Sequence, residues 1–144
     1  MKVRALAVTA AALVVGTALA ILGPASPAVG FFSPPLLLDV RIQPTATLVA
    51  RGAAVDAGVE VTCAGASNAY LSVSIVQRVG SEVATGYGST QVGCTNQRQT
   101  VLVRVMASQG KAFKKGTAAA DAQISACTFQ VCGTETDQAT ISLS

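Results

Sequence analysis

The sequence predicts an all-β fold, an antiparallel β-sandwich of seven or eight strands with two disulfide bonds. Three observations support this prediction. Apolar and polar residues alternate over many short runs after residue 28, which is typical of strands with one buried face. Turn-forming residues separate these runs at intervals of about 8 to 12 residues. No window after residue 28 has sustained helical periodicity, and the four cysteines are even in number, as a disulfide framework requires.

The first 28 residues predict a secretory signal peptide. A short basic start, residues 1–4, precedes residues 5–22, which are apolar except for Thr9, Gly16 and Thr17. Small residues at 26–28 predict cleavage after Ala28, and residues 18–20 form the nearest competing site. The alternative is an uncleaved membrane anchor, because about 18 apolar residues can span a bilayer. We expect a secreted protein with no membrane attachment after signal removal.

The predicted domains are the signal peptide (1–28), an extended linker (29–35) and a single sandwich domain (36–144). Cleavage would remove Lys2 and Arg4, two of the ten basic residues, and leave eight against seven acidic ones. The basic character of the whole chain is therefore no indication of a nucleic-acid partner, and we expect none. Phe31, Phe32 and two prolines, Pro34 and Pro35, predict an extended linker, with a hydrophobic strap lying on the domain as the alternative.

Each predicted strand follows from its own alternation. The runs are residues 36–42, 45–49, 59–63, 70–77, 82–92, 100–106, 118–126 and 139–143. Pro44 separates the first two and predicts an edge strand after it. Gly86 and Gly88 predict a bulge in the run 82–92. Residues 108–116 form a predicted polar loop. The arrangement is typical of a sandwich of immunoglobulin type, and without crossover helices we expect no parallel pairing.

Four cysteines allow three connectivities. We expect Cys63 to pair with Cys94 and Cys127 with Cys132. Chain entropy alone would contribute about 3.7 kcal/mol for the first bridge and about 2.2 kcal/mol for the second. The main alternative pairs Cys63 with Cys127, a separation typical of the inter-sheet bridge of immunoglobulin domains. The buried Trp that accompanies that bridge is impossible here, because the chain has no Trp.

The composition excludes several kinds of catalysis. The chain has no His, which removes His-dependent nucleophile systems and His-based zinc sites, and paired cysteines leave no thiol nucleophile. Two carboxylates could still form the site of a glycosidase, and the candidates are Glu60, Glu82, Asp121, Glu135 and Asp137. Glu135 and Asp137 lie two apart in a predicted loop, where solvation of the loop is the preferred interpretation. We therefore expect no enzyme, no metal and no cofactor.

The ligand-binding candidates are aromatic: Phe129, Tyr70, Tyr87 and Phe113. Phe129 lies between Cys127 and Cys132, where it would cover the open end of the sandwich or face a ligand, and covering is the preferred interpretation. For the two tyrosines, core-capping is preferred over lining a cleft. Phe113 lies among three lysines in the predicted polar loop, which would bind an anionic polymer or remain solvated, and solvation is preferred.

Four segments and one glycine carry a family resemblance. They are Pro44-Thr-Ala-Thr-Leu, followed by Gly52 and then Gly58-Val-Glu-Val, Ala126-Cys-Thr-Phe-Gln-Val-Cys132, and the terminal Ala139-Thr-Ile-Ser. These segments resemble the opening strands, short disulfide loop and last strand of the neocarzinostatin family. The chain as a whole resembles small exported immunoglobulin-like proteins of actinomycete-type bacteria with no assigned role. The resemblance implies a seven-stranded sandwich with an open cleft at one end, which in the neocarzinostatin family carries a hydrophobic chromophore.

These observations together predict an exported, non-enzymatic binding or interaction module of bacterial origin. The alternative is a neocarzinostatin-like carrier of a small hydrophobic molecule, and a small carboxylate-dependent hydrolase is a further alternative. The sequence names no partner. A small hydrophobic ligand or a component of the cell envelope fits the prediction.

Overall fold

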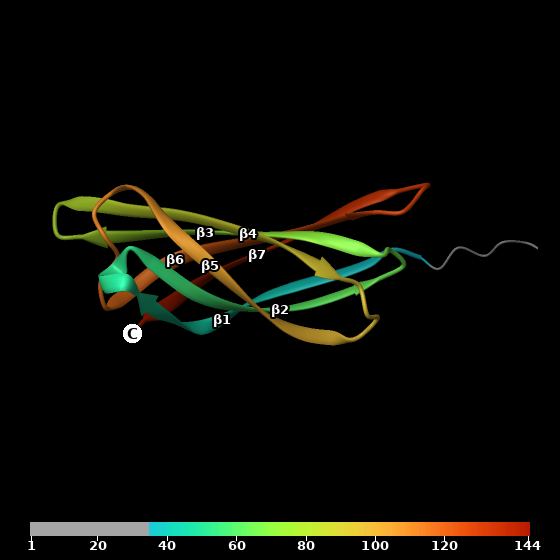
Figure 1. Cartoon of the computed structure of the whole chain (residues 1–144), viewed down its shortest axis with the longest axis horizontal. Helices are drawn as coiled ribbons and strands as arrows, with labels where there is room; N and C mark the ends of the chain where they lie inside the picture. Colours follow the sequence, from blue (N-terminus) through green and yellow to red (C-terminus); the bar gives the residue numbers. More distant parts are fainter. Residues whose placement is uncertain (1–34) are drawn as a thin grey trace, which may run out of the picture. The chain divides into compact units, whose positions relative to one another are not determined.

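The computed structural model describes residues 35–144 of the chain. The predicted signal peptide and all of the predicted linker except Pro35 lie outside these residues. Seven strands and one short 3-10 turn make up the described part (Figure 1). They are β1 (Leu37–Val49), η1 (Ala50–Gly52), β2 (Ala54–Ala64), β3 (Asn68–Val79), β4 (Glu82–Gly93), β5 (Arg98–Gly110), β6 (Gly116–Cys127) and β7 (Cys132–Leu143). No helix among the described residues has the length and apolar character needed to cross a membrane.

The prediction of an all-β chain is confirmed, but the sheet closes on itself. The strands follow the order β1-β2-β5-β4-β3-β6-β7, and β1 then pairs with β7 to form a closed barrel. That last pairing is parallel and joins Thr45 to Ser142 and Ala46 to Leu143. The expectation of purely antiparallel pairing is therefore wrong. A parallel pair needs a long connection between its strands, and here the other five strands supply it.

Two of the pairings that close the barrel are short. β4 and β5 pair from Ala84 with Gly110 to Tyr87 with Met106, with a register shift between Thr85 and Gly86. This shift confirms the bulge that the glycines of β4 predict. By contrast, β3 pairs with β4 along its whole length from Asn68 to Val79. The barrel thus has two narrow joints, one between β4 and β5 and the other between β1 and β7.

Two strand predictions are corrected. β1 continues through Pro44, so the predicted runs 36–42 and 45–49 form one strand, which begins at Leu37 and has a register shift between Ile42 and Ala46. β7 begins at Cys132, so Glu135 and Asp137 lie in a strand and not in a loop. The sequence pattern misses this part of β7 because the strand buries little apolar surface there, and its residues are polar on both faces.

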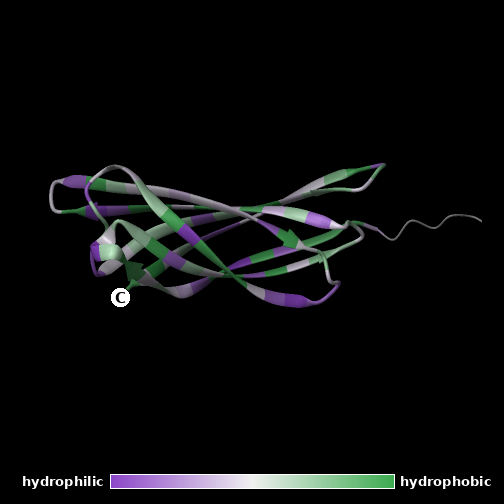
Figure 2. Cartoon of the chain, viewed as in Figure 1, coloured by the Kyte–Doolittle hydropathy of each residue, from purple (hydrophilic) through white to green (hydrophobic). Residues whose placement is uncertain are grey.

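The core consists of the inward-facing residues of all seven strands, and Figure 2 shows hydrophobic and hydrophilic segments alternating along them. Most of the largest buried side chains are β-branched or Leu: Leu71, Ile75, Ile124, Ile141, Leu143 and Val55. Such residues pack well on a pleated surface. The buried aromatic residue is Phe113, which enters the core from the segment between β5 and β6.

The predicted cysteine pairing is confirmed. Cys63 pairs with Cys94 across a Cα–Cα distance of 4.7 Å, and Cys127 pairs with Cys132 across 4.0 Å. The first bridge ties the end of β2 to the residue after β4, and the second closes the β6–β7 hairpin. All four cysteines of the chain are therefore oxidised.

Candidate functional site

The candidate site lies at the end of the barrel that carries both disulfides. The β2–β3 turn, the β4–β5 turn, the β6–β7 loop and the start of β1 meet there. Backbone hydrogen bonds join two of these turns, because Cys94 donates to the carbonyl of Ser67 (3.0 Å) and Asn96 donates to that of Cys63 (3.1 Å). Together with the Cys63–Cys94 bridge, these bonds hold the two turns in fixed positions. Binding groups placed here lose little conformational entropy when a ligand arrives.

The β6–β7 loop holds Phe129 away from the core. The Thr128 hydroxyl accepts hydrogen bonds from the backbone N–H groups of Gln130 (3.1 Å) and Val131 (3.0 Å). The Thr128 N–H donates to the Val131 carbonyl (2.8 Å), which completes a local turn of the kind that Thr often forms. Phe129 lies at the tip of this turn and is 84% exposed. The preferred interpretation, that Phe129 covers the open end, is wrong, since the turn directs it into solvent.

A pocket of about 680 Å³ opens beside Phe129. Its apolar walls come from Pro35 and Leu37 at the start of the domain, Ala64 and Ala66 in the β2–β3 turn, and Phe129. Ser67, Asn96 and Thr128 add a few polar groups. A concave, mostly apolar pocket of this size with a small number of polar groups is typical of small-molecule sites.

Leu37 is a site residue that the sequence analysis missed. Its side chain is 57% exposed and lines the pocket. Its position within the run Leu36-Leu37-Leu38 carries the signal that could have identified it, because strand alternation makes the middle residue point opposite to its neighbours. Together with Phe129, Leu37 places two exposed large apolar side chains around one pocket.

Tyr70 lies near Phe129 but lines a separate hollow on the outer face of β3. This hollow of about 430 Å³ is bordered by Asn68, Tyr70, Gln91 and Ser125, among others, and shares Ser67 and Cys127 with the pocket beside Phe129. Tyr70 is 51% exposed, and its hydroxyl donates to Ser89 Oγ (2.7 Å). The interpretation of Tyr70 as a core-capping residue is therefore wrong, because its ring lies on the surface of the sheet.

Tyr87 lies outside the candidate site. It is 53% exposed on the outer face of β4, and its register partner on β5 is Met106. The preferred core-capping interpretation of Tyr87 is wrong for the same reason as for Tyr70, since β4 turns this side chain to the solvent side of the sheet.

Phe113 lies inside the core at the other end of the barrel, next to Gly52 of η1, and is 2% exposed. Its N–H donates to the Gly52 carbonyl (2.8 Å), and the backbone of Phe113 approaches Gly52 so closely that no Cβ would fit there. Gly52 has a φ of +87°, which glycine adopts readily. The prediction of Phe113 as a solvated or ligand-binding residue is therefore wrong.

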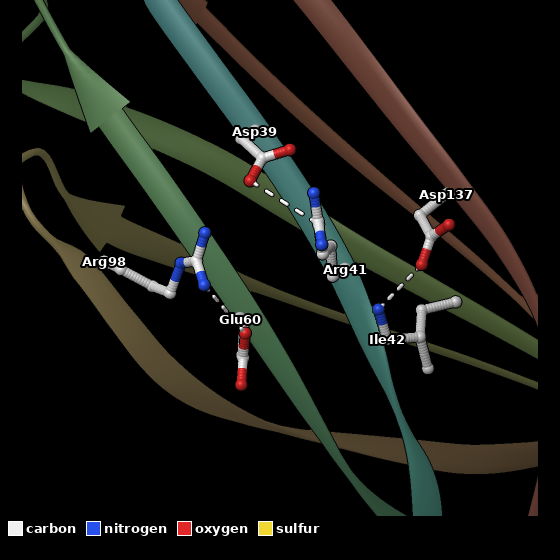
Figure 3. A network of polar contacts seen from close by, with 6 residues as sticks. All are labelled: Asp39, Arg41, Ile42, Glu60, Arg98 and Asp137. Carbon is white, nitrogen blue, oxygen red and sulfur yellow. Dashed lines mark hydrogen bonds and ion pairs between the residues drawn. The ribbon is translucent and has the colours of Figure 1, made fainter.

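The candidate carboxylates bind protein groups at separate places. Asp137 accepts a hydrogen bond from the backbone N–H of Ile42 (2.8 Å) across the β1–β7 joint, and Glu60 pairs with Arg98 (3.8 Å), as Figure 3 shows. Glu82 pairs with Lys111 (2.8 Å). None of the five candidates lines the pocket beside Phe129. Within residues 35–144, no cluster of three or more potential metal-ligating side chains occurs.

The strongest ion pair lies on the opposite face of the barrel from Tyr70. The Arg104 guanidinium donates to both oxygens of Asp56, with distances of 2.7 and 2.8 Å. These hydrogen bonds hold the pKa of Asp56 below its ordinary value; burial opposes this shift, and the positive charge of Arg104 adds to it. The Arg104–Asp56 pair is bidentate, which makes its geometry specific, although the Arg104 side chain is exposed to solvent.

The described residues define a small all-β domain with two disulfides and an apolar pocket at one end. No protein-family model matches the chain, and a search of curated proteins finds no match either. One similar solved structure is AggA, the major subunit of aggregative adherence fimbriae type I from Escherichia coli. It shares 13% sequence identity over 78% of this chain and 96% of that chain, with a TM-score of 0.38. A TM-score this low supports no conclusion about fold or function.

Proposed function

We propose that the protein is an exported, non-enzymatic binding module that takes an apolar ligand at its disulfide-bearing end. The observation that carries the proposal is Phe129, which is 84% exposed on a loop closed by a disulfide and stands at the rim of a pocket of about 680 Å³. Exposing a large aromatic ring to water is unfavourable, and a rigid loop that maintains this exposure favours a role in binding.

Two disulfides support export, because such bonds persist in oxidising compartments outside the cytoplasm. The predicted signal peptide agrees with this proposal. The strand order also supports the immunoglobulin-like reading of the fold. If β1 to β7 are taken as the seven strands of that fold in order, β1-β2-β5-β4 corresponds to one of its sheets and β3-β6-β7 to the other.

A small hydrophobic molecule is the occupant that the pocket favours. The volume falls within the range of about 300–1,000 Å³ that is usual for such ligands, and Leu37 and Phe129 supply apolar walls on two sides. This choice agrees with the resemblance to the neocarzinostatin family, in which an open cleft carries a chromophore. The resemblance to small exported actinomycete-type proteins remains a prediction.

Native followed by denaturing mass spectrometry tests the proposal on protein recovered from the culture medium of its own host. We expect an additional mass that is lost on denaturation and is absent from the Phe129→Ser variant. Leu102→Ser is the matched control, since Leu102 is an exposed apolar residue (66%) on β5 away from the pocket. A bare polypeptide mass for the wild type would contradict the carrier role and favour a cell-envelope partner. A ligand retained by Phe129→Ser would contradict the assignment of the site.

A further inference from the structure

The outer face of β3, β4, β6 and β7 is almost free of charge. Among the outward positions of these four strands, the charged residues are Arg78 and Asp121. Hydroxyl and amide side chains dominate the middle of the face: Ser72, Ser74, Gln123, Ser125, Thr136 and Gln138. Such a surface offers many neutral hydrogen-bond donors and acceptors.

The charged residues of the sheet gather on the other side of the barrel. The outer face of β1, β2 and β5 carries three ion pairs: Asp39 with Arg41 (3.8 Å), Glu60 with Arg98 (3.8 Å) and Asp56 with Arg104 (2.7 Å). Interspersed charges of this kind are usual on a sheet face that only needs to remain soluble. The neutral face is different in kind: because it presents few charges, an uncharged partner complements it.

Two shallow hollows lie along the neutral face, the first across β4, β3 and β6 and the second across β3, β6 and β7. The first contains Tyr70, whose register partner on β6 is Ser125, and has a volume of about 430 Å³. The second contains Ser74, whose register partner is Asp121, and has a volume of about 360 Å³. Four residues along β3 separate Tyr70 from Ser74, a distance of roughly 13 Å. The two hollows therefore form a linear track suited to a chain of repeating units.

Tyr70 provides an aromatic surface on this track. Its hydroxyl donates to Ser89 Oγ (2.7 Å) on the neighbouring strand β4, at a position diagonal to Tyr70 in the register. The Tyr70 side chain therefore reaches across the outer face toward β4, within the span that diagonal neighbours allow, and it remains 51% exposed. Tyr87 is a second half-exposed ring on the same face, and its register partner on β3 is Ser74.

Asp121 provides a fixed acceptor in the second hollow. Gln138 Nε2 donates to one of its carboxylate oxygens (2.9 Å), which orients the group and leaves further acceptor positions open. Ser74, Gln138 and Thr140 line the same hollow. A carboxylate surrounded by hydroxyl and amide groups forms charge-assisted hydrogen bonds to hydroxyl donors, which are stronger than neutral ones.

We propose that the outer face of β3 and β6 binds a neutral polysaccharide. A pyranose ring has apolar C–H faces that stack on an aromatic ring and hydroxyl groups around its edge that hydrogen-bond in its plane. Tyr70 provides the stacking surface in the first hollow, and Asp121 and Gln138 bind sugar hydroxyls in the second. The polymer carries no charge, in agreement with the face that it covers. This proposal is independent of the pocket beside Phe129.

Affinity electrophoresis in native gels tests the proposal with the full mature protein. The gels contain dissolved mixed-linkage β-glucan, galactomannan or starch, and a gel with dextran sulfate serves as the charged comparison. We expect at least one neutral polymer to retard the wild type, and dextran sulfate not to. Tyr70→Ala should weaken the affinity by about tenfold or more, as exposed Tyr anchors commonly do. Tyr70→Phe keeps the ring and should retain binding.

The controls separate this face from the rest of the protein. Leu102→Ala, on the charged face, and Phe129→Ser, beside the apolar pocket, should leave the retardation unchanged. Circular dichroism and intact mass establish that each variant is folded and carries both disulfides. Absence of retardation by all three neutral polymers overturns the proposal. Equal retardation of the wild type and both Tyr70→Ala and Asp121→Ala overturns it as well, as does stronger retardation by dextran sulfate.

Discussion

Gln77 is expected to fasten the segment between β5 and β6 to the barrel. Its side chain is 4% exposed, and its amide makes two hydrogen bonds to the backbone of Lys114. Gln77 Nε2 donates to the Lys114 carbonyl (2.7 Å), and the Lys114 N–H donates to Gln77 Oε1 (2.8 Å). This pair of bonds reproduces the contact that a neighbouring strand would make. It holds the residue next to Phe113, so that Phe113 remains in the core.

The Gln77→Met substitution should lower the free energy of unfolding by about 2–4 kcal/mol. Met has a similar length and no amide, so both hydrogen bonds are lost, at about 1 kcal/mol each. The N–H and C=O groups of Lys114 lose their partners in a partly buried place, which raises the cost of each lost bond from about 1 to as much as about 2 kcal/mol. Packing should change little, because Met fills irregular space well.

Equilibrium unfolding in guanidinium chloride, with both disulfides intact, measures this difference. The matched control is Gln123→Met, since Gln123 is an exposed glutamine on β6. The control should stay within about 0.5 kcal/mol of the wild type. The slope of the unfolding free energy against guanidinium concentration should be equal for all three proteins, which would show that their unfolded states are comparable.

A loss below about 1 kcal/mol for Gln77→Met would refute this reasoning, since it is smaller than the net value of two ordinary hydrogen bonds. It would mean that burial of Phe113 holds the segment without help from the amide. An equal loss in Gln123→Met would also refute it, because the cost would then belong to any Gln-to-Met change on this barrel.

Two further predictions concern charge and disulfides. Arg104 lowers the pKa of Asp56, so the ion pair should stabilise the folded state above about pH 4 and lose this effect as the pH falls through the folded pKa. Urea unfolding of the wild type and of Asp56→Asn measures the effect as a difference in unfolding free energy. A difference that does not change with pH would contradict this prediction. Replacing Cys63 and Cys94 with serine should lower the free energy of unfolding by about 3.7 kcal/mol, and replacing Cys127 and Cys132 should lower it by about 2.2 kcal/mol. Thermal unfolding measures both losses, and the reverse order would exclude chain entropy as the cause.

The local pattern of the sequence predicted most of the strands and the observed cysteine pairing. Alternation along each strand depends on residues two apart, so a single pass along the chain detects it. The same holds for the bulge at Gly86, since interior glycines in a strand mark it locally. The two cysteine pairs follow from spacing and from the absence of Trp. The part of β7 that buries little apolar surface was missed because it lacks this pattern.

The candidate site depended far more on the tertiary structure. The sequence singled out Phe129 and Tyr70 as candidates. It did not show that Phe129 lines a pocket or that Tyr70 lies on the surface of the sheet. Thr128 hydrogen bonds decide the direction of Phe129, and a Ser89 partner decides that of Tyr70. Neither partner can be inferred from aromatic character alone. Leu37 lines the pocket because the start of β1 lies beside the β2–β3 turn.

The sequence by itself determined an all-β, disulfide-bonded chain, because strand alternation and cysteine spacing are local properties. Only the tertiary structure decided that the sheet closes into a barrel and that Phe113 enters the core. Closure depends on the pairing of β1 with β7 and on the bond from Ile42 to Asp137, residues 95 positions apart. Burial of Phe113 depends on Gln77 and Gly52, which lie on other elements. Contacts across such separations leave no periodic trace in the sequence, and geometry alone brings them together.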